Sequence, residues 1–156
     1  MNQLDLGALF TTLRAHDVDY VLIGGVAVAA HGYLRTTADA DIVPDPGHDN
    51  LRRLGNALVS LNATLPLAGD ATFDHSKHGR ALERRRNLTL ETSQGALDIV
   101  QDARGVPSYA TLNAAAVDAE MLGVDVRICS LGHLKAMKQA AGRLQDKLDL
   151  EHLPPG

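Results

Sequence analysis

The chain has 156 residues, a formal net charge of −4, one cysteine and two Phe with three Tyr as its aromatic residues. This length suits one compact domain, which we expect to span residues 1–156 and to hold a core without metal or disulfide. The lone Cys129 excludes an intrachain disulfide framework and a cysteine-built zinc site. The mild acidity argues against general DNA binding, and the shortage of aromatic rings disfavours recognition by base stacking.

The N-terminus and the hydropathy of the chain predict a cytoplasmic protein. Residues 1–5 carry no basic flank before an apolar run, so we expect no signal peptide. No apolar stretch reaches the roughly 18 residues that a membrane span requires, so we expect no membrane partner. Composition therefore indicates a small bacterial-type enzyme or binding domain.

The first part of the chain predicts a helix, a strand and a second helix. Residues 4–16 place apolar side chains at three- and four-residue spacings, typical of one face of an amphipathic helix. The β-branched and apolar run 20–23 predicts a strand, which Gly24 and Gly25 stop. The alanine-rich residues 26–31 predict a helix that ends before a glycine.

The remaining elements follow from the same two periodicities. Residues 37–43 have an alternating pattern, bounded by Pro44 and Pro46, that predicts a strand. Leucines every three or four positions predict a helix over 51–61. Residues 62–80 show no clear period. Further strands are predicted over 87–91, 96–101 and 124–129, the first two joined by a turn. The helices predicted over 130–152 belong to the same domain. The fold class is α/β (α+β), with a mixed central sheet of about four to six strands flanked by helices.

Asp39 and Asp41 form the strongest chemical signal in the sequence. Their side chains alternate with Ala40, so both carboxylates point to one face of the predicted strand, about 6–7 Å apart in strand rise. Mg²⁺ binds one or two carboxylates together with phosphate oxygens, and without a cation two such charges repel. The alternative is a solvated strand end with two surface aspartates.

Gly24 and Gly25 lie where the predicted strand passes into a helix. Glycine lets the backbone approach a ligand, and a helix N-terminus offers unpaired N–H groups to a phosphate. A tight strand-to-helix turn is the simpler interpretation of the pair. The order of the motifs favours phosphate binding by the glycines, because Asp39 and Asp41 follow them after one predicted helix.

Asp98 is a third candidate carboxylate. It lies in an apolar strand segment, where burial of a carboxylate is unfavourable unless the group is paired or bound to metal. A neighbouring strand would bring it beside Asp39 and Asp41. An outward-facing residue on an alternating strand is the alternative.

These residues together resemble the signature of the nucleotidyltransferase superfamily, which has the DNA-polymerase-β-like fold. The signature is a Gly-Gly pair, an Asp-x-Asp pair and a later Asp, and 13 residues separate Gly25 from Asp39, at the upper limit of the family's spacing. Segment 24–42 is most similar to the bacterial AbiEii branch, which includes toxins of toxin–antitoxin pairs. The resemblance covers roughly residues 18–152, and it includes the closing motifs Lys135-x-x-Lys138 and Arg143-x-x-Asp146-x-x-Asp149.

The resemblance implies a metal-dependent enzyme that transfers an NMP from an NTP to a protein, RNA or small-molecule hydroxyl, and its AbiEii part adds a role within a toxin–antitoxin system. Asp39, Asp41 and Asp98 would be the catalytic residues and would hold two Mg²⁺ ions. Asp98 would also help to activate the attacking hydroxyl. Gly24 and Gly25 would bind the triphosphate through backbone N–H groups.

Three further residues complete the nucleotide-binding set that the resemblance implies. Lys138 and Asp146 lie on the predicted C-terminal helices, with the lysine directed toward phosphate; a solvated, salt-bridged helix face is the alternative. Arg35 either contacts phosphate or anchors the loop before the strand. Toxins of the AbiEii type usually carry a larger C-terminal helical domain, so substrate choice here would depend on a partner chain or a homodimer.

A locally basic segment, residues 75–86, either holds an RNA or protein acceptor or is a solvated face. The second hypothesis for the whole chain is a non-catalytic interaction module that keeps the fold and regulates another chain. It would use this segment or the C-terminal helices. A phosphate-binding Rossmann-type domain fits less well, because the sequence lacks three spaced glycines after the strand.

Overall fold

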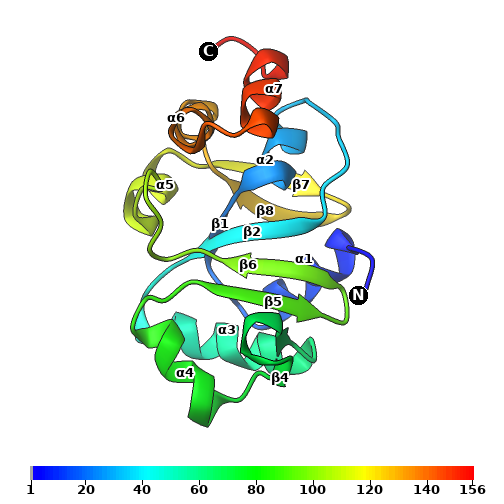
Figure 1. Ribbon diagram of the computed structural model, residues 1–156, viewed down its shortest axis with the longest axis vertical. Helices are drawn as coiled ribbons and strands as arrows, with labels where there is room; N and C mark the ends of the chain where they lie inside the picture. The colour runs from blue at the N-terminus through cyan, green and yellow to red at the C-terminus, as the bar shows by residue number, and fades with distance from the viewer. Residues whose placement is uncertain (1) are drawn as a thin grey trace.

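The computed structural model describes residues 2–156, in which helices surround one mixed sheet (Figure 1). The helices are α1 (Leu6–Ala15), α2 (Gly24–Ala30), α3 (His48–Ser60), α4 (His75–Glu83), α5 (Tyr109–Ala115), α6 (Leu131–Ala141) and α7 (Leu144–His152), with a short 3₁₀ helix, η1 (Pro66–Ala68). Within the described residues, none of these helices has the length and apolar character needed to cross a membrane.

The sheet contains eight strands in the described part of the chain, in the order β4-β3-β5-β6-β2-β1-β8-β7. The strands are β1 (Tyr20–Ile23), β2 (Asp39–Pro44), β3 (Thr64–Leu65), β4 (Ala71–Thr72), β5 (Leu88–Thr92), β6 (Gly95–Ile99), β7 (Val117–Met121) and β8 (Val124–Ile128). β2 is antiparallel to β1 and parallel to β6, while β8 is parallel to β1. Two hairpins, β5–β6 and β7–β8, complete the ladder. The predicted mixed α+β architecture is confirmed.

The sheet is larger than the predicted four to six strands. β3 and β4 have two residues each, too few to show an alternating pattern, and they lie within the stretch 62–80 that has no clear period. β7 is mostly exposed and alternates acidic with apolar residues at the sheet edge, so it lacks the apolar signal of a buried strand. The sequence did not predict α4 for a similar reason. Leu82 is the one residue of this helix that is buried, so no apolar period marks it.

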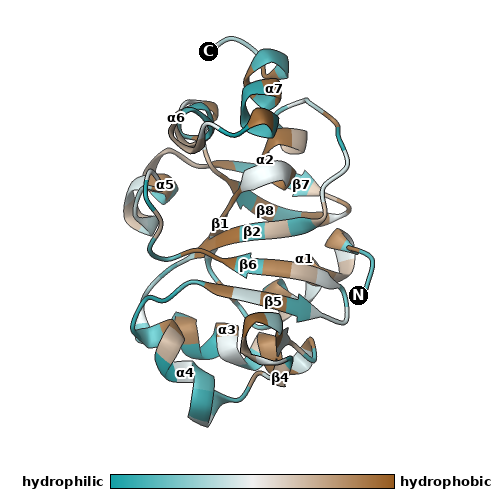
Figure 2. Cartoon of the chain, viewed as in Figure 1, coloured by the Kyte–Doolittle hydropathy of each residue, from teal (hydrophilic) through white to brown (hydrophobic). Residues whose placement is uncertain are grey.

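The two faces of the central strands differ in character. On β2, Ala40 and Ile42 are fully buried, and Leu97 and Ile99 on β6 join the same core. α1 and α3 contribute leucines to this core, whereas α4 is mostly hydrophilic (Figure 2). Because successive side chains on a strand point to opposite faces, the residues between these core positions point away from the core. That polar face carries the candidate site.

Candidate functional site

The parallel pairing of β2 with β6 brings three aspartates together. Asp41 lies directly opposite Asp98 in the β2–β6 ladder. Asp39 lies two residues before Asp41 and therefore points to the same face of β2. One carboxylate oxygen from each side chain lies within 4.8 Å of the others. All three residues are half-buried. The structure therefore assembles the predicted carboxylate group from two strands that are more than fifty residues apart in the chain.

Mutual repulsion and burial favour protons on this group when no cation is present. Burial, together with the charges of Asp39 and Asp98, raises the pKa of Asp41 from 3.8 to about 7, while Lys138 opposes the rise. Burial also raises the pKa of Asp98 to about 6, with contributions from a hydrogen bond and the charge of Asp39. A divalent cation at this point would remove the repulsion.

The donor set fits a hard divalent cation. Carboxylate oxygens are the protein ligands that Mg²⁺ and Ca²⁺ prefer, and a Mg²⁺ site needs only one or two of them when phosphate supplies the rest. Asp39, Asp41 and Asp98 provide three such groups on one open face of the sheet. These residues can therefore hold Mg²⁺ together with a phosphorylated ligand.

Gly24 is required by its contact with the carboxylate group. Its φ is +73°, a left-handed conformation that favours glycine. A Cβ at this position would overlap Oδ2 of Asp41 and would lie 2.9 Å from the Cγ of the same residue. Because Ile23 lies opposite Asp41 in the β1–β2 ladder, the strand pairing itself sets this approach. Glycine here lets α2 begin directly beside the acidic group.

Gly25 makes room for the loop that precedes β2. A Cβ at Gly25 would lie 2.8 Å from Oγ1 of Thr37 and 3.1 Å from Nη2 of Arg35. The first N–H groups of α2 have no partner within the helix, as at any helix start. Side chains from the loop thus lie close to this helix start, where the sequence predicts phosphate.

Lys138 and Asp146 belong to a buried ion cluster between α6 and α7. The Lys138 ammonium lies 3.2 Å from Oδ1 of Asp146 and 3.0 Å from Oδ2 of Asp149. Asp149 also accepts two hydrogen bonds from Arg35, from Nε at 2.8 Å and from Nη2 at 3.0 Å. Arg143 covers the outer side of Asp146, with Nε 2.8 Å from Oδ2. These contacts lower the pKa of both carboxyl groups despite their burial.

The cluster adjoins the three aspartates. The charge of Lys138 lowers the pKa of Asp41, and the charges of Asp39 and Asp41 raise the pKa of Arg143. The contacts of Arg35 are those of an anchor, since its Nη1 donates to the carbonyl of Thr36 while its other nitrogens hold Asp149. Its predicted contact with a nucleotide stays a prediction, as do those of Lys138 and Asp146.

Thr89 is a site residue that the sequence did not single out, and Asp149 was placed in a closing motif without a role in the site. Asp149 was visible as the last member of a three-residue repeat on α7, but its burial and its bond to Arg35 were not. Thr89 lies opposite Asp98 in the β5–β6 hairpin, and its side chain makes a hydrogen bond that lowers the pKa of that carboxyl group. The predicted turn between these two strands was the available signal, because counting outward from the turn along both strands pairs Thr89 with Asp98.

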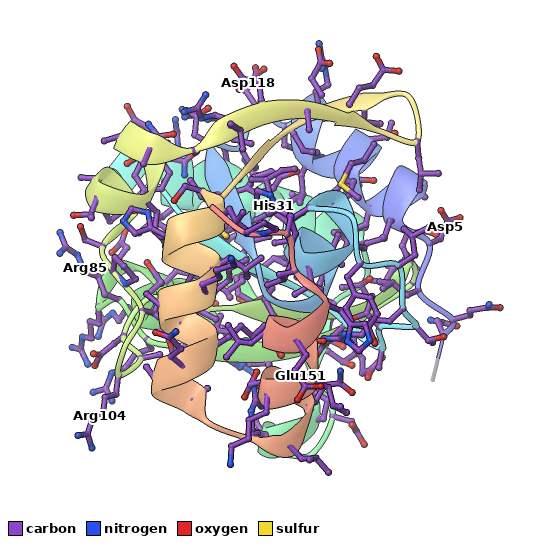
Figure 3. All side chains as sticks on the ribbon, turned by 90° about the horizontal axis from the view of Figure 1, so that it is seen from above. Asp5, His31, Arg85, Arg104, Asp118 and Glu151 are labelled. Atoms are coloured by element: carbon purple, nitrogen blue, oxygen red, sulfur yellow. The ribbon has the colours of Figure 1, made fainter. Side chains whose placement is uncertain are left out.

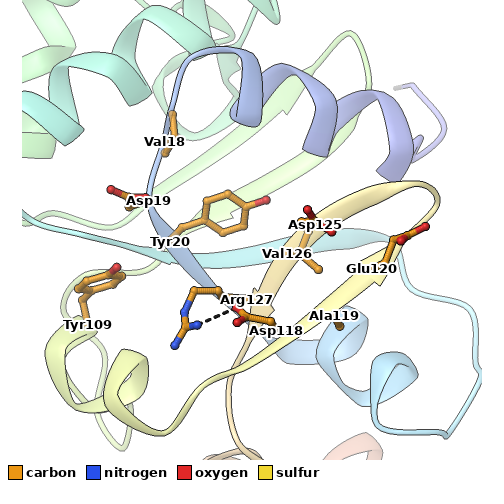
Figure 4. A pocket seen from close by; sticks show the side chains of 10 residues that line it. All are labelled: Val18, Asp19, Tyr20, Tyr109, Asp118, Ala119, Glu120, Asp125, Val126 and Arg127. Carbon is orange, nitrogen blue, oxygen red and sulfur yellow. Dashed lines mark hydrogen bonds and ion pairs between the residues drawn. The ribbon is translucent and has the colours of Figure 1, made fainter.

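A cavity of about 610 Å³ lies away from the carboxylate group, at the opposite end of β1 (Figure 4). Tyr20, which lines it, pairs with Pro44 at the far end of β2, whereas Asp41 pairs with Ile23. Arg127 and Asp118, joined at 2.7 Å, form part of its wall. The candidate metal site is instead on the exposed polar face of the sheet.

Comparison with known proteins gives structural likenesses and no sequence match. No protein-family model and no curated protein matches the chain. The fold is similar to the crystal structure of a putative nucleotidyltransferase from Thermotoga maritima, with a TM-score of 0.58 and 15% sequence identity over 94% of this chain and 88% of that one. At such low identity the likeness shows the fold alone. It supports the fold that the motifs predicted, while the AbiEii branch stays a prediction.

Proposed function

We propose that this chain is a metal-dependent nucleotidyltransferase that transfers an NMP from an NTP to a hydroxyl group of a protein, RNA or small molecule. The observation that carries the proposal is the group formed by Asp39, Asp41 and Asp98 beside Gly24. An acidic group on a sheet is common without a ligand. Here it coincides with a glycine whose Cβ would displace Asp41, and with the fold of a putative nucleotidyltransferase.

The reaction is an in-line displacement at the α-phosphorus. A bond forms between the acceptor oxygen and the α-phosphorus, the bond from that phosphorus to the β-bridging oxygen breaks, and pyrophosphate leaves. Asp39, Asp41 and Asp98 would hold the cations, and Mg²⁺ bound there supplies neutralisation of the phosphate oxygens. Asp98, ionised at neutral pH once a cation is bound, would orient the acceptor hydroxyl and accept its proton.

Two other parts of the site would act on the nucleotide. Backbone N–H groups at the start of α2, at Gly24 and Gly25, would donate to phosphate oxygens. Lys138 would offset negative charge near Asp41, as its effect on the pKa of that residue indicates. Asp146 would hold the ammonium group in place.

The finer predictions belong to the same proposal. We infer an AbiEii-like bacterial enzyme of the cytoplasm that acts within a toxin–antitoxin system. A homodimer or a partner chain would contribute to acceptor choice. The interaction-module hypothesis is less well supported, because loss of activity would leave no reason to retain three converging carboxylates and Gly24.

Label transfer from NTPs tests the proposal. The chain would be incubated with each of the four α-³²P-labelled NTPs, Mg²⁺ and extracts that supply RNA and protein acceptors. We expect transfer that Asp39→Asn with Asp41→Asn abolishes. A matched control, Asp118→Asn with Asp125→Asn, removes two exposed carboxylates outside the site and should leave transfer intact.

Absence of both nucleotide binding and transfer with all four NTPs would contradict the enzyme hypothesis. So would transfer that survives the double substitution at Asp39 and Asp41. A partner chain that copurifies equally well with the wild type and with a variant lacking all three site aspartates, in the absence of transfer, would favour the interaction module.

A further inference from the structure

Six exposed cationic side chains lie on α4, on the turn after it and on the loop after β6. This arginine surface consists of Lys77, Arg80, Arg84, Arg85, Arg86 and Arg104. Five of the 15 lysines and arginines of the chain fall within residues 77–86, where Glu83 is the one acid, although the net charge of the chain is −4. Figure 3 shows Arg85 and Arg104 projecting from the same side of the molecule.

The charges of the arginine surface are not neutralised by the protein. Within residues 2–156, none of its six side chains forms a salt bridge. Glu83 is paired with His48 at 2.9 Å. Two other carboxylates lie near the surface: Asp102 lines the same cleft as Arg85, and Asp74 caps α4, where the charge of Lys77 helps to lower its pKa. The surface therefore presents concentrated positive charge to solvent.

The turn that carries three of these arginines is fixed to the end of β6. Asn87 accepts hydrogen bonds from the backbone N–H groups of Gln101 at 2.8 Å and Asp102 at 3.0 Å, and donates to the Asp102 carbonyl at 2.7 Å. The Gln101 side chain donates at 3.1 Å to the carbonyls of Leu82 and Arg86. β6 carries Asp98, so the arginine turn is held in a set position relative to the candidate site.

The backbone at Arg85 does not favour arginine. Arg85 follows the last residue of α4 and its cap, with a φ of 57°. Glycine is the usual residue in this left-handed position after a helix, and α6 ends in this way with Gly142 at a φ of 62°. Among the other non-glycine residues at positive φ in residues 2–156, three are Asp or Asn (Asp17, Asn62 and Asp70) and the fourth is Leu122. The turn thus gives no preference for arginine at position 85, whereas the charge of the surface does.

The composition of the surface favours a phosphate backbone over a protein partner. Protein interfaces centre on buried aromatic or apolar anchors. The exposed large hydrophobic residues in the described part of the chain lie outside 74–87 and 101–107. Arginine forks match the paired oxygens of phosphate groups, and repeated phosphate contacts need no apolar centre.

We propose that the arginine surface binds the phosphate backbone of a single-stranded nucleic acid and thereby presents it as acceptor; this rests on the proposed function. In Figure 1 the turn after α4 lies beside the end of β6, in agreement with the hydrogen bonds of Asn87 and Gln101. A nucleic acid that crosses Arg85 and Arg104 would therefore pass the end of β6, the β-strand that carries Asp98. The surface is local, which is consistent with an acidic protein that does not coat DNA.

Fluorescence anisotropy tests the proposal without any need for catalysis. Fluorescein-labelled single-stranded RNA and DNA of one sequence would be titrated with the chain in EDTA, without NTP, at several salt concentrations. For single strands the slope of log K against log salt changes by about 0.7 per phosphate contact. Substitution of Arg84, Arg85 and Arg86 by Gln should therefore reduce the slope by about 2. It should also weaken binding to the single-stranded RNA, and to the DNA where the wild-type chain binds DNA.

The matched control changes the same charge elsewhere. Arg14→Gln, Arg53→Gln and Lys147→Gln together remove three positive charges from α1, α3 and α7, and we expect binding to persist; circular dichroism would verify the fold of both triple variants. Equal weakening by both variants, no binding to either strand, or equal competition by polyglutamate would overturn the proposal. Transfer activity without nucleic-acid binding would leave the proposed function standing with another acceptor.

Discussion

Arg35 and Asp149, 114 positions apart in the chain, form a two-point ion pair that joins the loop before β2 to α7. The Asp149 side chain is fully buried and that of Arg35 is 19% exposed. Removal of the Arg35 guanidinium leaves the buried carboxylate of Asp149 without two of its hydrogen-bond donors. We expect Arg35→Met to lower the free energy of unfolding by about 3 kcal/mol in urea denaturation.

The control for this substitution is Arg143→Met. Arg143 contacts Asp146 through the same kind of group, but its side chain is 76% exposed. Solvent screening therefore limits its contribution, and we expect a loss below about 1 kcal/mol. Equal losses from the two variants would show that burial of the Arg35 pair is not the deciding factor.

Gly24→Ala should impair metal binding more than stability. The new methyl group would overlap a carboxylate oxygen of Asp41 and displace it from the other two aspartates. Gly69→Ala is the matched control, because Gly69 has a φ of +67° and no atom near its Cβ position. Both variants should lose about 1 kcal/mol of stability from backbone strain. Calorimetric titration with Mn²⁺ should show weakened binding in Gly24→Ala alone.

The metal-free chain should become less stable as pH rises from about 4 to about 7. Over this range Asp41 keeps its proton in the folded state, where its pKa is about 7, but loses it in the unfolded state, where the pKa is near 3.8. The folded state thus binds more protons, so the free energy of unfolding falls with pH. Thermal denaturation in EDTA between pH 5 and pH 8 measures the trend.

Two comparisons make the pH experiment specific to the carboxylate group. Asp41→Asn should reduce the slope, because one of the two carboxyl groups with a raised pKa is gone and Asp98 remains. Mg²⁺ should raise the melting temperature more at pH 8 than at pH 5.5, since protons compete with the cation at Asp41 and Asp98. An unchanged slope in the Asn variant would assign the pH dependence to other residues.

Thr89→Val should weaken metal binding mainly at acidic pH. The Thr89 side chain forms a hydrogen bond that lowers the pKa of Asp98, so its loss should raise that pKa further above about 6. Valine suits an exposed strand position, and the fold should remain stable. We expect a several-fold loss of Mn²⁺ affinity, about 1 kcal/mol, at pH 6 and a smaller loss at pH 8. Thr64→Val, on β3, should change neither value.

The parts of the fold that sequence could predict are those with a local period. β1, α2 and β2 follow from an apolar run, a glycine pair and an alternating segment, and the same alternation placed Asp39 and Asp41 on one face. Asp98 could be added because a carboxylate in an apolar strand needs a partner. Each of these signals is local, because it is contained in a few neighbouring residues of the chain.

The remaining features depend on contacts between distant segments. Nothing near Arg35 in the sequence indicates that its partner is Asp149, and nothing near Asp98 indicates Thr89. β7 escapes prediction because an exposed edge strand carries no buried face. Periodicity reports which side of an element faces the core, so it does not identify polar pairs that form between elements.

The burial of Asp149 also has a consequence for the synthesis of the chain. A nascent chain that has not yet emerged as far as α7 already contains the metal-site aspartates and both halves of their sheet. It lacks the acid that neutralises Arg35 and Lys138, so two cations remain uncompensated between the loop and α6. The site therefore reaches its final charge balance only when α7 docks, which couples metal-site assembly to the emergence of that helix.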